Sequence, residues 1–480
     1  MAEQFDLIVI GAGPGGYVAA IRASQLGMKV AVLEKRVTLG GVCLNEGCIP
    51  SKALLDSSEH FAVARDRFAG HGIEIDSPRL NLPVMLARKD EVVKRLTDGV
   101  AYLFKKNKIT LFYGIARLKG PDGSGLQQVA LEPADQSGDQ PVFEPGQLLT
   151  APRVLLATGS EALALPNIPF DGELVVSAKE ALGFERVPEH LVVVGGGPIG
   201  LELGSVWRRL GARVTVLDLL PDLLPSMDRQ AAAALQRALK KQGVEFRLGV
   251  RVSGLRRLGS KGLVQFTAGN DSGELDCDRL LVAIGRRPVL ADLGFEALGG
   301  KLLENGRISV DADYQTSVAG IYAIGDLIPG PMLAHKASEE GVVCVERMAG
   351  SRAAVVEYDY LPGVVYTWPE GASVGKTEEQ LKHENVPYKA GSFNFLGNGR
   401  ARAMDETEGF AKVLAHTETD RILGVHIVGP RASDMIAEAV TAMGFMGTAR
   451  DMGMLFHAHP TLSEALKEAA LDLHEEAIHA

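Results

Sequence analysis

The chain has 480 residues, a net charge of −10, 55 glycines and only four cysteines. At roughly 150 residues per domain, this length favours about three domains. The acidic balance argues against a nucleic-acid-binding surface, and so few cysteines argue against the disulfide framework of a small secreted protein.

The first clear pattern covers residues 5–35, FDLIVIGAGPGGYVAAIRASQLGMKVAVLEK. An apolar strand, a glycine turn, a helix and a second apolar strand predict a βαβ unit. In the turn, Gly11 permits the tight bend, Gly13 lets a pyrophosphate approach the backbone, and Gly16 lets the helix pack closely on the strand. The helix N-terminus offers N–H groups to the phosphates. Glu34, which ends the second strand, can accept hydrogen bonds from a ribose hydroxyl.

Two cysteines, Cys43 and Cys48, follow directly in GGVCLNEGCIPSK, residues 40–52. Their spacing and the lack of a second Cys or Cys/His pair argue against a zinc site. A pair of buried, inert cysteines is the alternative. The place of the segment after the βαβ unit favours a redox-active disulfide. A helix is expected to begin close to Cys48, and a helix N-terminus stabilises a thiolate.

The next segment predicts helices and then short strands. Residues 51–108 have helical periodicity, and residues 109–156 form strands broken by the turns PDGSG and DQSGDQP. A strand then leads into ATGS at residues 157–160.

A second βαβ unit covers residues 190–219, HLVVVGGGPIGLELGSVWRRLGARVTVLDL. Its turn contains Gly195, Gly197 and Gly200, and its second strand ends in Asp218. The last glycine and the acid are 18 positions apart in both units. Two such units predict two bound dinucleotides, although glycine turns in a purely structural sheet are the alternative. A carboxylate at Asp218 suits a free 2′-hydroxyl and repels a 2′-phosphate, so NAD is favoured over NADP.

The remaining chain predicts further strands and a separate α+β domain. Short strands end at LLVAIGRRP, residues 280–288, and TSVAGIYAIGD, residues 316–326, predicts a strand and a turn. After about residue 350, strands are expected at 363–366, 410–415 and 422–428, with helices from Ser433 onward. Cys277 and Cys344 are expected to be buried structural residues.

The motifs GAGPGG, GGVCLNEGCIPSK, ATGS, GGGPIGLELG, AIGRRP, GIYAIGD and HAHPTLSEA together resemble the flavoprotein pyridine nucleotide-disulfide reductase family along the full length. The resemblance implies an α/β fold with two Rossmann-like dinucleotide-binding domains, a central domain, and a C-terminal α+β dimerisation domain. The expected divisions are FAD binding at 1–159, NAD binding at 160–282, a central domain completing the FAD site at 283–350, and a dimer interface at 351–480. It also implies FAD and NAD as cofactors and an obligate homodimer.

The resemblance assigns roles to further residues. Asp326 resembles the carboxylate that binds the flavin ribityl chain, Lys52 and Glu202 an ion pair beside flavin and nicotinamide, and His459 and Glu464 the catalytic base and its partner across the dimer interface. Further cofactor-binding positions are Gly159, Gly285 and Ala334.

Each of these assignments has an alternative. Asp326 could merely close a turn, and Lys52 and Glu202 could be solvated helix charges. His457 is a second candidate for the base. His459 is preferred because it has the family's spacing to Glu464.

Within the family, the chain is most similar to members that oxidise protein-bound dihydrolipoyl groups and reduce NAD through the disulfide and FAD. Such proteins serve 2-oxo acid dehydrogenase complexes or the glycine cleavage system, and bind lipoyl domains of an acyltransferase or carrier protein. The alternatives are a mercuric or glutathione-type reductase, or a mainly structural binding subunit. Glutathione-type members would carry basic residues near Asp218, and mercuric reductase a C-terminal cysteine pair.

The expected location follows from what the sequence lacks. No apolar run reaches the roughly 18 residues of a membrane span, and the N-terminus carries no signal-peptide or transit-peptide pattern. We expect a cytoplasmic protein, or one of the mitochondrial matrix if a transit peptide has been removed.

Overall fold

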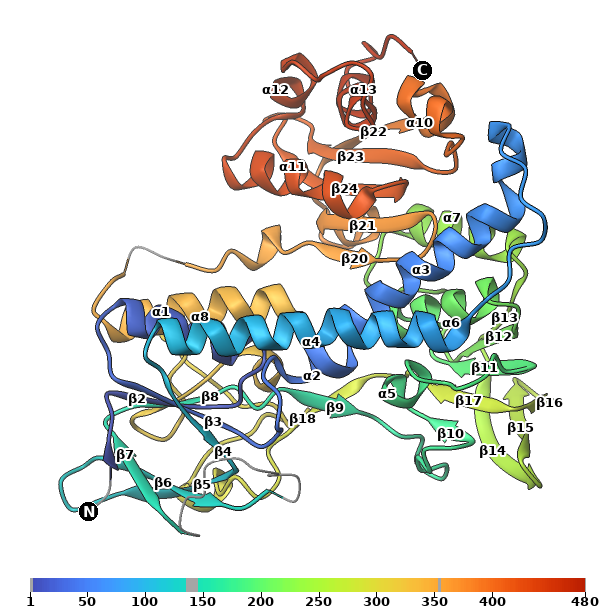
Figure 1. Cartoon of the computed structure of the whole chain (residues 1–480). Coiled ribbons are helices and arrows are strands. Elements are labelled where there is room, and N and C mark those ends of the chain that lie inside the picture. The colour runs from blue at the N-terminus through green and yellow to red at the C-terminus, as the bar shows by residue number, and fades with distance from the viewer. Residues whose placement is uncertain (1–2, 135–145, 353–354, 480) are drawn as a thin grey trace. The chain divides into compact units, whose positions relative to one another are not determined.

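The computed structural model describes residues 3–134, 146–352 and 355–479 (Figure 1). The chain divides into two compact units. Unit 1 comprises Met1–Ala53, Leu86–Leu163 and Gly285–Val356, and unit 2 comprises Leu54–Met85, Ala164–Ile284 and Glu357–Ala480. The four expected domains are a finer division and stay a prediction. The expected turn DQSGDQP lies outside the described residues.

A five-stranded parallel sheet forms the centre of unit 1, in the order β19-β8-β2-β3-β4. The strands are β2 (Leu7–Ile10), β3 (Val30–Glu34), β4 (Thr110–Tyr113), β8 (Val154–Leu156) and β19 (Ile321–Ala323). The central strands β2, β3 and β8 are buried throughout, as expected for a parallel sheet covered on both faces. Helix α1 (Pro14–Gln25) connects β2 to its parallel neighbour β3, so the first predicted βαβ unit is confirmed.

Helix α8 (Ala334–Met348) packs along α1, and the two helices lie side by side in Figure 1. Small residues permit this approach, because a Cβ added at Gly341 would lie 2.8 Å from the Gly15 carbonyl oxygen. An ion pair of 2.6 Å between Arg22 Nη2 and Glu346 Oε1 links the C-terminal ends of the two helices.

Smaller elements complete unit 1. A four-stranded sheet has the order β1-β7-β6-β5, and β18 pairs with β9. These strands are β1 (Glu3–Gln4), β5 (Ile115–Pro121), β6 (Gln127–Glu132), β7 (Leu148–Ala151), β9 (Ser160–Ala162) and β18 (Arg286–Pro288). The helices are α2 (Gly41–Glu46), α3 (Cys48–Asp66), α4 (Leu82–Lys106), and the 3₁₀ turn η3 (Gly325–Leu327). Both α3 and α4 contain residues of unit 1 and unit 2.

Unit 2 contains a second parallel sheet, in the order β10-β17-β11-β12-β13. Its elements are β10 (Val175–Val176), α5 (Ala178–Ala181), β11 (His190–Val194), α6 (Pro198–Arg209), β12 (Arg213–Asp218), α7 (Arg229–Lys241), β13 (Val244–Leu248) and β17 (Arg279–Val282). Helix α6 connects the parallel strands β11 and β12, so the second βαβ unit is also confirmed.

Three antiparallel strands, β14 (Arg251–Leu258), β15 (Lys261–Ala268) and β16 (Asp271–Cys277), form a separate sheet. Cys277 ends β16, and Cys344 lies in α8. Both are fully buried, as predicted.

The C-terminal part of unit 2 is an antiparallel sheet covered by helices, in the order β20-β21-β24-β23-β22. The strands are β20 (Gly363–Val365), β21 (Glu370–Gly375), β22 (Tyr388–Asn394), β23 (Phe410–His416) and β24 (Ile422–Gly429). The helices are α9 (Glu378–His383), α10 (Gly399–Met404), α11 (Ala432–Gly444), α12 (Ala449–Met454) and α13 (Glu464–Asp472). Helix α11 packs on β21 and β24, and α13 packs on β22 and β23.

This arrangement confirms the expected α+β region and its three predicted strands. Strands β21 and β22 were not predicted from the sequence. Their sequences, EGASVG and YKAGSFN, are rich in small or polar residues, so their strand propensity is weak and pairing with β24 and β23 decides their conformation. Among the described residues, no helix is long and apolar enough to cross a membrane.

Candidate active site

The first glycine turn lies between β2 and α1, where the parallel strands end. Gly11 has φ +101°, and a Cβ there would lie 2.4 Å from the Ala157 carbonyl oxygen that follows β8. A Cβ at Gly16 would lie 1.8 Å from the Gly11 carbonyl oxygen. Gly13, at the helix N-cap, has more open surroundings, with only Gly41 Cα near its Cβ position at 3.9 Å. The three glycines thus have the steric settings expected of a phosphate-binding turn.

Glu34 closes this turn from the end of β3. Its Oε2 accepts a hydrogen bond of 2.8 Å from the Ala12 amide, and its Oε1 accepts one of 3.0 Å from the Arg36 amide. Burial raises the pKa of Glu34, and the two backbone hydrogen bonds oppose that rise. Each oxygen retains a second lone pair, so the carboxylate can still accept a hydrogen bond from a ribose hydroxyl.

The second glycine turn, between β11 and α6, repeats this geometry. Gly195 has φ +113°, and a Cβ there would lie 2.4 Å from the Ala283 carbonyl oxygen that follows β17. A Cβ at Gly200 would lie 2.1 Å from the Gly195 carbonyl oxygen, whereas Gly197 has open space at its Cβ position. The correspondence between the two βαβ units therefore includes the neighbouring strand, β8 or β17, whose end faces the first glycine of the turn. Each of these strands also leads into a glycine with positive φ, Gly159 at +72° after β8 and Gly285 at +145° after β17.

Asp218 holds the second turn as Glu34 holds the first. Its Oδ2 accepts a hydrogen bond of 2.5 Å from the Gly196 amide, and its Oδ1 accepts one of 2.7 Å from the Leu220 amide. These two bonds fix the carboxylate at the end of β12.

The cysteine loop packs directly on the first glycine turn. Gly40 and Gly41 have φ of +92° and +59°, and a Cβ at Gly41 would lie 2.7 Å from Gly13 Cα. The side-chain amide nitrogen of Asn45, Nδ2, donates to the carbonyl oxygens of Leu39 and Gly41, at 2.9 and 2.8 Å. The same loop that presents the cysteines therefore forms one wall of the turn.

Cys43 lies in α2, and Cys48 is the first residue of α3, as predicted. Both cysteines are half-buried. A hydrogen bond with Cys48 and burial raise the pKa of Cys43, and the charge of Lys52 opposes this rise. The side chains of Cys43 and Cys48 therefore interact directly.

Lys52 lies one turn after Cys48 in α3, within unit 1. Glu202 lies in α6 of unit 2, where it is buried and its Oε1 accepts a hydrogen bond of 3.1 Å from the Tyr366 amide. The predicted ion pair between Lys52 and Glu202 stays a prediction.

Asp326 lies in η3, immediately after β19. Its Oδ2 accepts a short hydrogen bond from the Ser160 hydroxyl. Arg286 in turn donates to the Ser160 hydroxyl at 2.7 Å and to its carbonyl oxygen at 2.6 Å. Ala334, a further predicted cofactor-binding residue, is the first residue of α8.

His459 and Glu464 lie next to each other, as their spacing suggested. His459 Nδ1 and Glu464 Oε1 are 2.9 Å apart, and Glu464 Oε2 accepts a hydrogen bond of 2.8 Å from the Thr461 amide. Burial alone would raise the pKa of Glu464. The hydrogen bonds from Thr461 and His459 outweigh this effect and lower the pKa. The His459 side chain is 78% exposed in the single chain, and its Nε2 has no partner among the described residues.

His457 has a different environment. Its Nε2 lies 2.7 Å from Glu438 Oε1, and its Nδ1 lies 3.2 Å from the Leu455 carbonyl oxygen. The hydrogen bond with Glu438 raises the pKa of His457, whose side chain is only 8% exposed. Both ring nitrogens of His457 are engaged, which supports His459 as the residue able to take a proton from a substrate.

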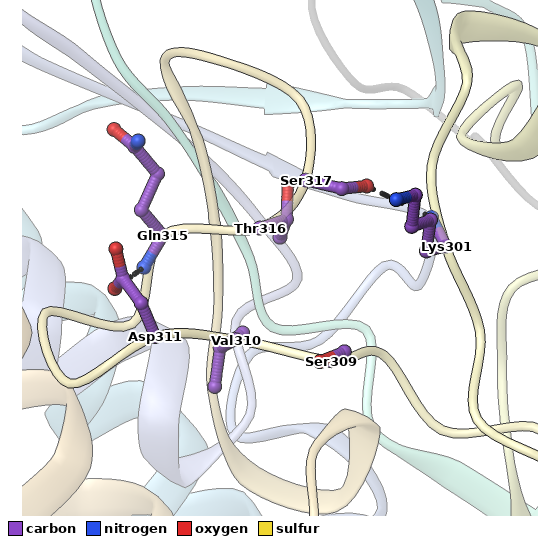
Figure 2. A pocket seen from close by; sticks show the side chains of 7 residues that line it. All are labelled: Lys301, Ser309, Val310, Asp311, Gln315, Thr316 and Ser317. Atoms are coloured by element: carbon purple, nitrogen blue, oxygen red, sulfur yellow. Dashed lines mark hydrogen bonds between the residues drawn. The ribbon is translucent and has the colours of Figure 1, made fainter.

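A separate hollow of about 280 Å³ lies in the Gly285–Val356 segment of unit 1, lined by residues that include Lys301, Asp311, Gln315 and Ser317 (Figure 2). Its walls are held by hydrogen bonds, from the Gln315 amide to Asp311 Oδ1 and from the Lys301 amide to Ser317 Oγ, both 2.9 Å. No predicted site residue lines this hollow. Within residues 3–134, 146–352 and 355–479, no cluster of acidic, histidine or cysteine side chains has a metal-binding arrangement.

Four polar residues around the Asp326 turn were not predicted from the sequence. Ser160, Lys336 and Glu340 bind the turn itself, and Arg286 binds Ser160. Ser160 and Arg286 belong to the recognised motifs ATGS and AIGRRP, so their positions carried a signal. Lys336 and Glu340 form a charged i,i+4 pair, a pattern that is more often typical of a solvated helix face.

Comparisons with known proteins show the family of this chain. Residues 5–341 match the family model for pyridine nucleotide-disulphide oxidoreductase, and residues 361–470 match the model for the dimerisation domain of the same family. The chain is 50% identical over 483 residues to dihydrolipoyl dehydrogenase 3 of Pseudomonas aeruginosa, with 100% of both chains covered. It is 47% identical over 480 residues to mitochondrial dihydrolipoyl dehydrogenase 2 of Arabidopsis thaliana, covering 100% of this chain and 92% of that protein.

One further relative and one solved structure are also similar to this chain. Leghemoglobin reductase of Glycine max is 45% identical over 472 residues, with 98% of this chain and 88% of that protein covered. The crystal structure of LpdA from Mycobacterium tuberculosis superposes with a TM-score of 0.88 at 26% identity, covering 97% of this chain and 99% of that one. The chain belongs to the pyridine nucleotide-disulphide oxidoreductase family.

Proposed function

We propose that this protein is a dihydrolipoyl dehydrogenase, which oxidises protein-bound dihydrolipoyl groups and reduces NAD⁺ through a redox-active pair, Cys43 and Cys48, and FAD. The observation that carries the proposal is the contact of Gly41 with Gly13, because it places the cysteine loop against the dinucleotide-binding turn. The dihydrolipoyl dehydrogenase relatives that match all of this chain support the choice of substrate.

The residues present fit both cofactors. The first turn, with the open position at Gly13 and the carboxylate of Glu34, would hold the pyrophosphate and adenosine ribose of FAD, and Asp326 would hold its ribityl chain. The second turn, with Gly197 and Asp218, would hold NAD. When bound, FAD would accept an electron pair from the reduced cysteines and pass it as hydride to NAD⁺.

The exchange begins with proton removal. The thiolate is the nucleophile, and an ordinary thiol has a pKa near 8.5. His459 can take this proton at Nε2, because Glu464 occupies Nδ1 and stabilises the imidazolium that forms. In the family's dimer this base would act on the disulfide of the partner subunit.

The lipoyl thiolate then attacks Cys43 Sγ of the oxidised pair. A lipoyl–Cys43 disulfide forms, the Cys43–Cys48 bond breaks, and Cys48 leaves as a thiolate. The second lipoyl thiol, deprotonated in turn, attacks the lipoyl sulfur of the mixed disulfide and expels Cys43. The lipoyl group is thereby oxidised to its cyclic disulfide, and the cysteine pair is reduced by two electrons. The start of α3 at Cys48 favours its thiolate through the helix dipole.

The partners of this reaction are a second copy of the chain and the lipoyl domains of an acyltransferase or carrier protein. We expect the protein to act in the cytoplasm, or in the mitochondrial matrix of a eukaryote. The match of residues 361–470 to a dimerisation domain supports the homodimer.

The proposal is tested by steady-state turnover of dihydrolipoamide with NAD⁺, with FAD content measured by absorbance. We expect NADH formation by the wild-type protein and none by Cys43→Ser, with FAD still bound in both. Cys277→Ser is the matched control, because this cysteine is buried at the end of β16 and belongs to no predicted site. Activity retained by Cys43→Ser would contradict the proposal, and a wild-type protein that binds lipoyl domains without turnover would indicate a structural subunit.

A further inference from the structure

Two oppositely charged side chains are completely buried in α8. Lys336 and Glu340 are both 0% exposed, and Lys336 Nζ lies 2.9 Å from Glu340 Oε1. Full burial of charges is costly even when they are paired. The other hydrogen bonds that Lys336 and Glu340 make therefore show which part of the fold this pair fixes.

Both side chains bind the backbone of one residue, Gly325. Lys336 Nζ donates to the Gly325 carbonyl oxygen at 3.0 Å, and Glu340 Oε2 accepts from the Gly325 amide at 2.7 Å. The ion pair thus closes a ring around a single residue. Gly325 has φ +70°, and a Cβ there would lie 3.1 Å from the Ala337 Cβ, between the two charged residues on α8.

Gly325 directly precedes Asp326, whose side chain is held from another direction. Ser160 donates to the Asp326 carboxylate, and Arg286 donates to the Ser160 hydroxyl. The carboxylate is therefore fixed through its backbone by the ion pair and through its oxygen by Ser160. Carboxylate direction matters here because hydrogen bonds weaken steeply when they are misaligned.

We propose that Lys336 and Glu340 are positioning residues of the flavin site, which hold the Gly325–Asp326 turn so that the Asp326 carboxylate receives the polyhydroxyl chain of FAD. This inference rests on the proposed function, because it takes Asp326 as the ribityl-binding residue. An apolar pair in α8 would fill the same space, but it would leave the amide and carbonyl of Gly325 unsatisfied.

The test uses Glu340→Gln, which keeps the shape of the side chain and removes its charge. The readout is the dissociation constant of FAD, measured as the rise in flavin fluorescence when the purified holoenzyme is diluted. We expect this constant to rise roughly 10- to 100-fold, since the single amide oxygen of glutamine can replace only one of the two carboxylate contacts, with Lys336 and with the Gly325 amide. The dissociation constant for NADH, bound in the other unit, serves as an internal reference and should stay within about twofold.

Glu346→Gln is the matched control. It also breaks an ion pair of α8, the one with Arg22 on α1, but it does not touch the Asp326 turn. We expect its FAD dissociation constant to stay within about twofold of wild type. Lys336→Met combined with Glu340→Gln removes both charges together, leaves no unpaired buried charge, and keeps the test possible if the single variant does not fold. Its FAD affinity should fall as well.

The inference is overturned if the folded Glu340→Gln or double variant binds FAD as tightly as wild type, or if Glu346→Gln weakens FAD binding equally. A wild-type protein without bound FAD would instead contradict the proposed function itself, so the two failures are distinguishable.

Discussion

Removal of the negative charge at Asp218 should weaken the preference for NAD⁺ over NADP⁺. In Asp218→Asn the side chain keeps an oxygen that can accept one of the two backbone hydrogen bonds, from Gly196 or Leu220, so the turn should persist. The bound 2′-phosphate of NADP⁺ would lie close to the carboxylate. One pair of unit charges about 4 Å apart repels by about 1 kcal/mol in water and about 4 kcal/mol at an effective dielectric constant near 20.

Asp218 is partly exposed, so a value of about 1 to 3 kcal/mol applies, which corresponds to roughly 5- to 150-fold. NAD⁺ also loses a charge-assisted hydrogen bond from its ribose. The ratio of kcat/KM for NAD⁺ to that for NADP⁺ should therefore fall by about tenfold or more. Both nucleotides are assayed at saturating dihydrolipoamide. Glu34→Gln, the matching change in the first βαβ unit, should leave this ratio of kcat/KM values unchanged. A ratio in Asp218→Asn that stays within about twofold of the wild-type ratio would refute the reasoning.

Four other outcomes are expected. His459→Gln should lower dihydrolipoamide turnover by about 10²- to 10⁴-fold with flavin content unchanged, and an inactive His457→Gln beside a normal His459→Gln would show the other histidine to be the base. Cys48→Ser should abolish turnover while retaining FAD, and full activity would exclude the disulfide scheme. Gly16→Ala should prevent FAD binding, because its Cβ would lie 1.8 Å from a backbone oxygen, and a normal flavin content would contradict this. Because Glu438 raises the pKa of His457, their pairing stabilises the fold fully below the unfolded value of about 6.5 and loses this contribution as pH rises through the folded pKa. Glu438→Gln should thus lower the thermal midpoint more near pH 5.5 than near pH 9, and equal losses would exclude that account.

Prediction from the sequence was most accurate where short-range steric constraints on the backbone are strict. Both βαβ units were identified from glycine turns followed by a terminal acid, because the positions of Gly11 and Gly195 allow no side chain beside the facing carbonyl. The start of a helix at Cys48 was also predictable from local pattern. The proximity of His459 to Glu464 followed from the resemblance.

Long-range pairing explains what the sequence did not reveal. Strands β21 and β22 depend on their partners in the sheet, and their own residues carry little strand signal. Lys336 and Glu340 have the spacing of a surface ion pair, and only the packing of α8 buries them against Gly325. Ser160 and Arg286 stood in recognised motifs, but their contacts depend on the pairing of β9 with β18.

Under the proposed function, electrons pass from a dithiol substrate through Cys43 and Cys48 to the flavin. Anaerobic addition of dihydrolipoamide to the oxidised holoenzyme, followed by visible absorption, tests it most directly. We predict a new long-wavelength band from charge transfer between the Cys48 thiolate and the flavin, and no such band in Cys48→Ser. A flavin spectrum that dihydrolipoamide leaves unchanged, or a band that persists in Cys48→Ser, would contradict the account.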